Sequence, residues 1–177
     1  RAQLILKNVS LIACEDTRHS GHLLKSLGAK GRRISFHKHN TNSKIPQLLE
    51  ILKQGQNTLA LISDAGLPGI SDPGEKLVSK AREAGHEVIC IPGPCAATTA
   101  LVSSGLPCER FCFEGFLPSK GKLRKERLAE LAIDMRTVVL YESPHRLIQL
   151  LKELEQLCGK DRPLQIAREL TKRHEEQ

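Results

Sequence analysis

Residues 58–84 read TLALISDAGLPGISDPGEKLVSKAREA, and this stretch decides the fold class of the chain. Residues 58–62 are apolar and rich in β-forming side chains, which is typical of a buried strand. Residues 75–84 carry their apolar side chains on one face of a helix. A buried strand, a loop and an amphipathic helix form one strand–helix unit, which indicates an α/β sheet of mostly parallel strands.

The same alternation of strands and helices extends in both directions from this stretch. Further strands are predicted at residues 9–13, 87–91, 111–115, 137–141 and 164–168, and a short one leads into residues 35–40. Helices are predicted at residues 16–27, 44–54, 95–104, 122–132 and 145–157. We therefore expect two small α/β domains, residues 1–105 and 111–177, joined by a linker at residues 105–110.

The composition narrows the class of protein. The 177 residues are 40% hydrophobic, which suffices for one core or two small ones, and no apolar run reaches the ~20 residues of a membrane helix. No signal peptide is expected, since residues 1–8 are an ordinary amphipathic segment. Cys14 and Cys90 end apolar runs, so the six cysteines are predicted to be buried reduced thiols of an intracellular protein. The absence of a CxxC pair argues against a metal site.

The charge of the chain favours a polyanionic partner. Its formal net charge is +7 at neutral pH. Only 3% of the residues are aromatic and Trp is absent, which disfavours a surface that stacks single-stranded bases on aromatic rings. A bound nucleic acid would be held through its phosphates and its shape.

Two Gly- and Pro-rich loops follow predicted strands, at the sheet edge where open α/β folds bind ligands. In residues 63–74, three glycines let a ligand approach the backbone, and Asp64 offers an acceptor for hydroxyl groups. A long turn with no ligand is the alternative. In residues 91–97 (IPGPCAA), a rigid turn leads to a helix whose first N–H groups are free. Close packing of that helix on the sheet explains this motif equally well.

Two polar stretches also follow strands in the first half. In residues 14–20 (CEDTRHS), Asp16 or Thr17 is expected to cap a helix, whereas capping does not explain Arg18. In residues 35–40 (SFHKHN), His37 and His39 alternate onto one side. A metal is a weak alternative there because a third ligand is missing, and contacts to RNA or nucleotide are favoured.

The second half carries two comparable stretches. Residues 141–146 (YESPHR) place Glu142 and Arg146 where a strand passes into a helix. Residues 167–175 (ARELTKRHE) place Arg168 and Lys172 after the last predicted strand. Solvated surface and phosphate binding are both open interpretations of this tail.

Taken together, CEDTRHS, SFHKHN, SDAGLPGISDPG, IPGPCAATTAL, FEGFLP, YESPHR and ARELTKRHEE closely resemble the ribosomal RNA small-subunit methyltransferase I family, within the tetrapyrrole-methylase superfamily. The resemblance covers essentially the whole chain. It implies two α/β domains with S-adenosylmethionine in a cleft between them, and commonly a homodimer. The implied reaction is methylation of a cytidine 2′-hydroxyl in 16S-type ribosomal RNA or the small ribosomal subunit, inside a bacterial cell or an organelle.

The resemblance also assigns roles to residues. It implies a donor site at Asp64 and its loop neighbours, the small residues after the Pro-Gly turn, and the end of a strand in the second domain: Ser63, Asp64, Ala65, Gly69, Ile70, Cys95, Ala96 and Tyr141. The superfamily loop reads Gly-Asp-Pro where this chain has Ser-Asp-Ala, and relatives often have Ser where this chain has Cys95. A thiol is a weak donor, so a contact there is expected from the backbone.

For the reaction itself, Glu142 is the predicted base and no metal is required. Phosphates are assigned to Arg18, Arg146, Arg168 and Lys172, and further substrate contacts to His37, His39 and Asn40. Two alternatives remain. The first is a methyltransferase of the same fold acting on a tetrapyrrole or another small molecule. The second is a non-catalytic RNA-binding module. The family begins with a strand and a Thr-Pro-Ile-Gly-Asn loop that forms part of the donor site. Residues 1–177 start after that loop, and the family's final strands are also missing from them.

Overall fold

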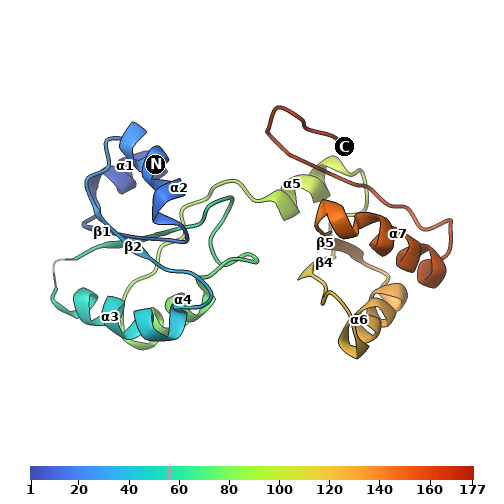
Figure 1. The fold of residues 1–177 in the computed structure, drawn as a ribbon, viewed down its shortest axis with the longest axis horizontal. Coiled ribbons are helices and arrows are strands. Elements are labelled where there is room, and N and C mark those ends of the chain that lie inside the picture. Colours follow the sequence, from blue (N-terminus) through green and yellow to red (C-terminus); the bar gives the residue numbers. More distant parts are fainter. Residues whose placement is uncertain (56) are drawn as a thin grey trace. The chain divides into compact units, whose positions relative to one another are not determined.

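A computed structural model describes residues 1–55 and 57–177, which form two compact units (Figure 1). The units are Arg1–Pro94 and Cys95–Gln177. The boundary therefore lies ahead of the predicted linker at residues 105–110. Helix α5 (Ala96–Ser103) accounts for the difference, because it belongs to the second unit, where the Ala97 N–H donates to the Tyr141 hydroxyl at 3.1 Å. Among the described residues, no helix combines the length and apolarity needed to cross a membrane.

The first unit is built on a parallel sheet, as the strand–helix alternation predicts. Its strands are β1 (Leu11–Cys14), β2 (Arg32–Ser35) and β3 (Leu59–Ile62), in the order β2-β1-β3. All four residues of the central strand β1 are buried. A strand buried on both faces is continuously apolar, which explains why LIAC shows no alternation.

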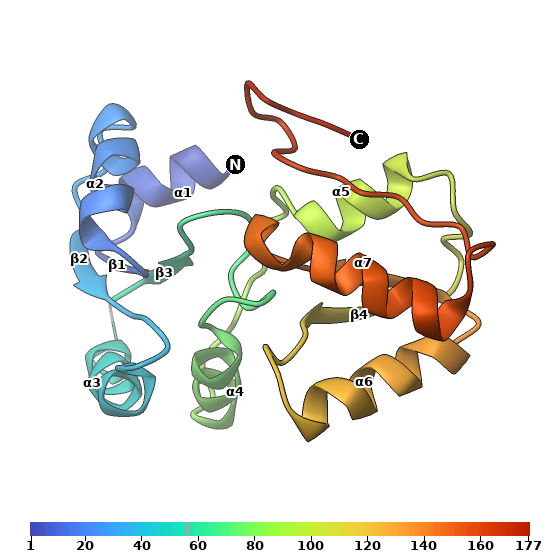
Figure 2. The same ribbon diagram turned by 45° about the vertical axis from the view of Figure 1, so that its right-hand side comes forward.

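Helices cover both faces of this sheet (Figures 1 and 2). Side chains alternate along β1. Leu11 and Ala13 pack in the cluster that includes Leu48 of α3 (Thr41–Lys53) and Leu77 of α4 (Glu75–Glu83). Ile12 packs in the opposite cluster, with α1 (Ala2–Asn8) and α2 (Thr17–Ser26). This three-layer arrangement fixes the carboxyl ends of the strands, from which the functional loops extend.

The second unit repeats the pattern on a smaller scale. Strands β4 (Phe111–Phe116) and β5 (Thr137–Tyr141) pair in parallel, with a register shift between Phe113 and Gly115. Besides α5, its helices are α6 (Lys122–Ile133) and α7 (Pro144–Cys158). Its core consists of leucines from these elements and the loop after β4: Leu117, Leu128, Leu131 and Leu150.

Two predicted strands are wrong. Residues 87–91 and 164–168 form no strand, and Ile89 and Leu164 are 58% and 51% exposed. Both segments are rich in β-forming residues, but a strand also needs a hydrogen-bonded neighbour. In the described part of the chain residues 87–91 pair with nothing, and 164–168 contribute one isolated bridge, from Arg168 to Glu176.

The cysteines differ in whether they are buried, as the predicted strands do. All six are free, and Cys14 in the central strand is buried as predicted. Cys90 and Cys108 are exposed. The prediction of a buried Cys90 was wrong because it depended on a strand at residues 87–91.

Candidate functional site

The first unit brings three polar loops to one edge of its sheet. Cys14, at the end of β1, is in register with Ser35 of β2 and Ile62 of β3. The segments that follow these strands therefore leave the sheet at the same level. This is where ligands bind in open parallel sheets. The loops meet directly, because the Asp16 backbone N–H donates to Asp64 Oδ1 at 3.3 Å.

The loop after β3 is a compact, largely backbone surface. Its first residue is anchored by Ser63 Oγ, which donates to the carbonyls of Ala65 and Gly66 at 3.2 and 3.0 Å. The loop folds back on itself at Gly74, where a Cβ would lie 3.0 Å from Leu61 and 3.2 Å from the Gly69 nitrogen. Five of the predicted donor-binding residues share this loop: Ser63, Asp64, Ala65, Gly69 and Ile70.

The same edge gathers negative charge. Burial, opposed by a hydrogen bond from Ser63, raises the pKa of Asp72, and the charge of Asp64 raises it further. Burial also raises the pKa of Glu15, with added repulsion from Asp72 and Asp64. Carboxylates that repel one another in this way favour a cationic group beside them and disfavour a phosphate.

Asp16 belongs to this edge but has a structural role. It is the N-cap of α2, and its Oδ1 accepts the Arg18 N–H at 2.7 Å. That backbone hydrogen bond lowers the pKa of the Asp16 carboxyl. The capping interpretation of Asp16 is therefore confirmed. Arg18 is the neighbour that capping leaves free: its side chain is 91% exposed and makes only a 3.5 Å ion pair with Asp16.

The polar side chains after β2 mainly organise their own turn. Asn40 Oδ1 accepts the His37 N–H at 2.9 Å, and Asn40 Nδ2 donates to the Ser35 carbonyl at 3.1 Å. The rings of His37 and His39 lie 6.1 Å apart. No group of three His, Cys, Asp or Glu side chains that could hold a metal occurs among the residues described. Asn40 is thus committed to the turn, whereas His39 is exposed.

In the second unit, the predicted base Glu142 is enclosed by arginines. Its side chain is 5% exposed, Oε1 lies 2.6 Å from Arg146 Nη2, and Oε2 lies 3.9 Å from Arg124 Nη1. Glu142 Oε1 also accepts the Ser143 N–H at 2.8 Å. These contacts favour a role for Glu142 in holding Arg146.

Arg124 is a central residue that the sequence analysis missed. It is 3% exposed, donates to Glu153 Oε2 at 2.6 Å and to the Pro118 carbonyl at 2.8 Å. The hydrogen bond from Arg124 lowers the pKa of Glu153. A signal was present, because Arg124 lies at i, i+4, i+7 spacing with Leu128 and Leu131 on the apolar side of α6. A charged residue on such a stripe indicates a buried ion pair.

The remaining predicted residues of the second unit belong to α5, to the end of β5 and to the C-terminal tail. Cys95 is the N-cap of α5, Ala96 is its first residue, and Tyr141 ends β5. In the tail, Arg168 pairs with Glu176 at 3.0 Å and Lys172 with Glu169 at 3.3 Å. Those two cations are therefore partly neutralised, which weakens their assignment to phosphates.

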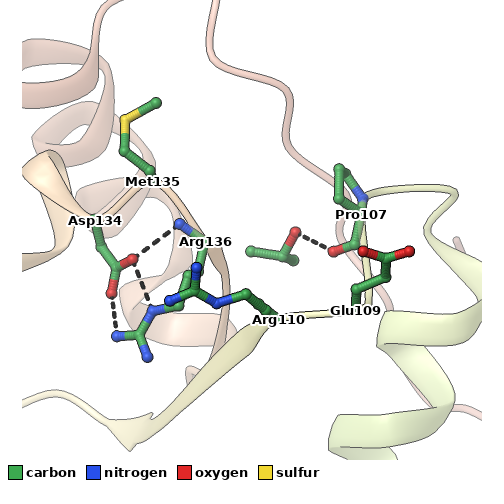
Figure 3. A pocket seen from close by; sticks show the side chains of 7 residues that line it. Pro107, Glu109, Arg110, Asp134, Met135 and Arg136 are labelled. Carbon is green, nitrogen blue, oxygen red and sulfur yellow. Dashed lines mark hydrogen bonds and ion pairs between the residues drawn. The ribbon is translucent and has the colours of Figure 1, made fainter.

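A pocket of about 380 Å³ in the second unit involves none of the predicted residues (Figure 3). On its wall Arg136 faces Asp134, with Nη2 and Oδ2 2.6 Å apart. The Arg136 hydrogen bonds lower the pKa of Asp134 to about 2. Thr137 Oγ1 donates to the Pro107 carbonyl at 2.6 Å. Because none of the predicted site residues lines this pocket, it is not the candidate site.

Comparisons with known proteins find related sequences over nearly the whole chain. The sequence profile of the tetrapyrrole (corrin/porphyrin) methylases matches residues 1–177. The chain is 51% identical over 176 residues to the ribosomal RNA small subunit methyltransferase I of Synechocystis sp., covering 99% of this chain and 63% of that protein. It is 50% identical over 172 residues to the protein of that name from Escherichia coli O157:H7, covering 97% and 60%. The chain thus spans 60–63% of the length of these relatives.

Solved structures share the fold at low sequence identity. Uroporphyrin-III-C-methyltransferase from Thermus thermophilus superposes with a TM-score of 0.58 and 21% identity, covering 88% of this chain and 65% of that one. The cobalt precorrin-4 methyltransferase CbiF gives 0.61 and 15%, covering 89% and 67%. The α/β fold class predicted from the sequence is confirmed.

Proposed function

Because the chain belongs to the tetrapyrrole (corrin/porphyrin) methylase family, we propose that it forms part of a methyltransferase acting on ribosomal RNA. The reaction is methyl transfer from S-adenosylmethionine to the 2′-hydroxyl of a cytidine ribose in small-subunit RNA. The observation that carries this proposal is about 50% identity, over at least 97% of the chain, to proteins named ribosomal RNA small subunit methyltransferase I. A homodimer and a cytoplasmic location remain predictions.

The loop after β3 fits the methyl donor. S-adenosylmethionine, when bound, supplies a methyl group activated on a positively charged sulfur. Asp64 is exposed and offers carboxylate oxygens to hydroxyl or ammonium groups, and the surrounding carboxylates favour a cation. The loop backbone at Ala65, Gly69 and Ile70 offers small or backbone groups to a flat ligand. Cys95, Ala96 and Tyr141 stay as the donor-site prediction for the second unit.

The chain's part in the chemistry is mainly positioning. Aligning a ribose hydroxyl with the methyl group lowers the barrier by up to ~7–11 kcal/mol in favourable cases. Cationic side chains that hold the phosphates on either side of the ribose achieve this alignment. Arg146 is one proposed positioning cation, held by the buried carboxylate of Glu142 at 2.6 Å.

Replacing Glu142 by Gln tests whether this residue is a base or holds Arg146. We expect a several-fold higher KM for RNA, with kcat, its pH profile and donor affinity unchanged, because only the orientation of Arg146 is lost. Arg146→Lys should retain part of the RNA affinity. A large fall in kcat together with loss of the acidic limb of the pH–rate profile would restore Glu142 as the base.

Methyl transfer itself is tested with radiolabelled S-adenosylmethionine and two acceptors, small ribosomal subunits and uroporphyrinogen III. Label should enter the RNA, and nucleoside analysis should find it on the 2′-oxygen of a cytidine. Label in the tetrapyrrole alone would favour the small-molecule alternative, whose fold relatives are tetrapyrrole enzymes. RNA binding without donor binding, measured calorimetrically, would leave a non-catalytic RNA-binding module.

A further inference from the structure

The net charge of the chain is concentrated in one segment. Residues 17–49 contain seven Lys or Arg and no Asp or Glu. The whole chain has 27 basic and 20 acidic residues, so the other residues carry twenty of each sign and are balanced. The excess of +7 therefore lies in a stretch that runs from α2 through β2 into α3. Four of the seven histidines lie in this stretch as well.

Within this stretch, helix α2 presents a cationic face. Arg18, His22 and Lys25 are spaced i, i+4, i+7, and all three are exposed. Residues at this spacing lie on one side of a helix. Their common side is therefore a row of groups that carry or can acquire positive charge.

Arg33 joins this face from the neighbouring strand. It lies on β2, the outer strand in the order β2-β1-β3. A Cβ built at Gly21 would be 2.5 Å from Arg33 Nη1, so the guanidinium lies against α2 where Gly21 leaves room. Gly21 is on the same helix face as Arg18 and Lys25. Figure 2 shows α2 and β2 next to one another. Lys30, exposed in the connection between them, adds a further charge.

These cations are available for a ligand. Lys25, Lys30 and Arg33 make no ion pair with a carboxylate among the residues described, and Arg18 makes only the 3.5 Å pair at 91% exposure. Three cations of the second unit, in contrast, are paired with carboxylates: Arg127, Arg168 and Lys172, at 2.9, 3.0 and 3.3 Å. A phosphate can therefore bind to α2 and β2 without displacing an internal partner.

We propose that Arg18, His22, Lys25, Lys30 and Arg33 form a surface, here called the basic surface, that binds the phosphate backbone of the RNA substrate. This inference rests on the proposed function. The basic surface starts at the donor loop, because Asp16, which caps α2, donates its N–H to Asp64. RNA phosphates along α2 would thus lead toward Asp64, while the carboxylates at the sheet edge keep phosphates away from the donor itself. With 3% aromatic residues in the chain, phosphate contacts are the expected means of binding.

The test compares two triple substitutions that remove equal charge. One is Arg18→Gln, Lys25→Gln and Arg33→Gln. The matched control is Lys120→Gln, Lys125→Gln and Lys152→Gln, three exposed lysines of the second unit. Binding of a fluorescent small-subunit ribosomal RNA fragment is followed by anisotropy over a range of salt concentrations, and donor binding by calorimetry.

We expect the first triple variant to lose roughly tenfold or more in RNA affinity at 0.1 M salt. Its log–log salt dependence should flatten by about 2, as for three lost phosphate contacts on single-stranded RNA. Donor affinity should not change, and the control triple should bind RNA within about twofold of the unsubstituted protein. The charge-retaining triple Arg18→Lys, Lys25→Arg and Arg33→Lys should restore binding, which separates charge from folding.

Equal losses in both triple variants, or none in the first, would overturn the basic surface while leaving the proposed function intact. A different result would contradict the proposed function: the unsubstituted protein would bind the donor in calorimetry but no RNA in the anisotropy measurement.

Discussion

Replacing Arg124 by Met should destabilise the second unit by about 3–5 kcal/mol, the range for removing one partner of a buried ion pair. The guanidinium is 3% exposed and holds Glu153 through two of its nitrogens, at distances of 2.6 to 3.3 Å. It also lies 3.9 Å from the buried carboxylate of Glu142. Without Arg124 both carboxylates lose a cation, and the Pro118 carbonyl loses its donor. Urea denaturation followed by circular dichroism measures the loss.

The matched control is Arg127→Met on the same helix. Arg127 pairs with Glu114 and Glu130 at 2.9 Å each, but its side chain is 44% exposed, so its loss should destabilise the unit much less than the loss of Arg124. The double substitution Arg124→Met and Glu153→Met should be less destabilising than Arg124→Met alone, because Glu153, the carboxylate that Arg124 binds most closely, is then removed, while Glu142 keeps its pair with Arg146. Equal losses of unfolding free energy in Arg124→Met and Arg127→Met would show that the buried ion pair does not stabilise the second unit. A larger loss in the double variant than in Arg124→Met would show the same.

Local features of the sequence predicted most of the fold. The helix stripes, the N-cap at Asp16 and the buried run of β1 depend on neighbours within a turn or on burial alone. The strand predicted at residues 87–91 was wrong, because its apolar composition indicated burial but said nothing about a neighbouring strand to pair with. The boundary between the two compact units differs from the predicted linker for a related reason, because the Ala97 N–H donates to the Tyr141 hydroxyl, 44 residues further along the chain. A linker-like Gly-Leu-Pro at residues 105–107 could not reveal that contact.

Part of the candidate site could likewise be predicted from local sequence, and part could not. The loop after β3 was recognisable because its glycines and Asp64 follow a strand in sequence, and parallel strands end at one edge. The enclosure of Glu142 was not recognisable, since Arg124 lies eighteen positions before it on another element. The basic surface was missed because net charge was considered for the chain as a whole. Counting charges along the sequence would have shown that residues 17–49 lack carboxylates.

Asp64→Asn should lower the affinity for S-adenosylmethionine by about 10- to 100-fold, in line with about 1.5–3 kcal/mol for a hydrogen bond to a charged group. Asn keeps the size of the side chain and an acceptor oxygen but removes the charge that favours a cationic ligand. Stability of the first unit should not fall, because Asp64 is exposed and its charge repels those of Glu15 and Asp72. Asp161→Asn, at an exposed position of the second unit, is the control and should bind the donor normally.

Kinetics then separate two roles for Asp64. If its carboxylate binds the donor equally well before and during transfer, Asp64→Asn raises the KM for the donor, and saturating donor restores kcat. If kcat instead falls at saturating donor, the carboxylate acts more strongly on the transition state than on the bound donor. We expect the first outcome, because the hydroxyl and ammonium groups of the donor, to which Asp64 is assigned, keep their charge while the methyl group is transferred. An unchanged affinity would remove the loop after β3 from the donor site, and the repulsion among its carboxylates would then have no ligand to offset it.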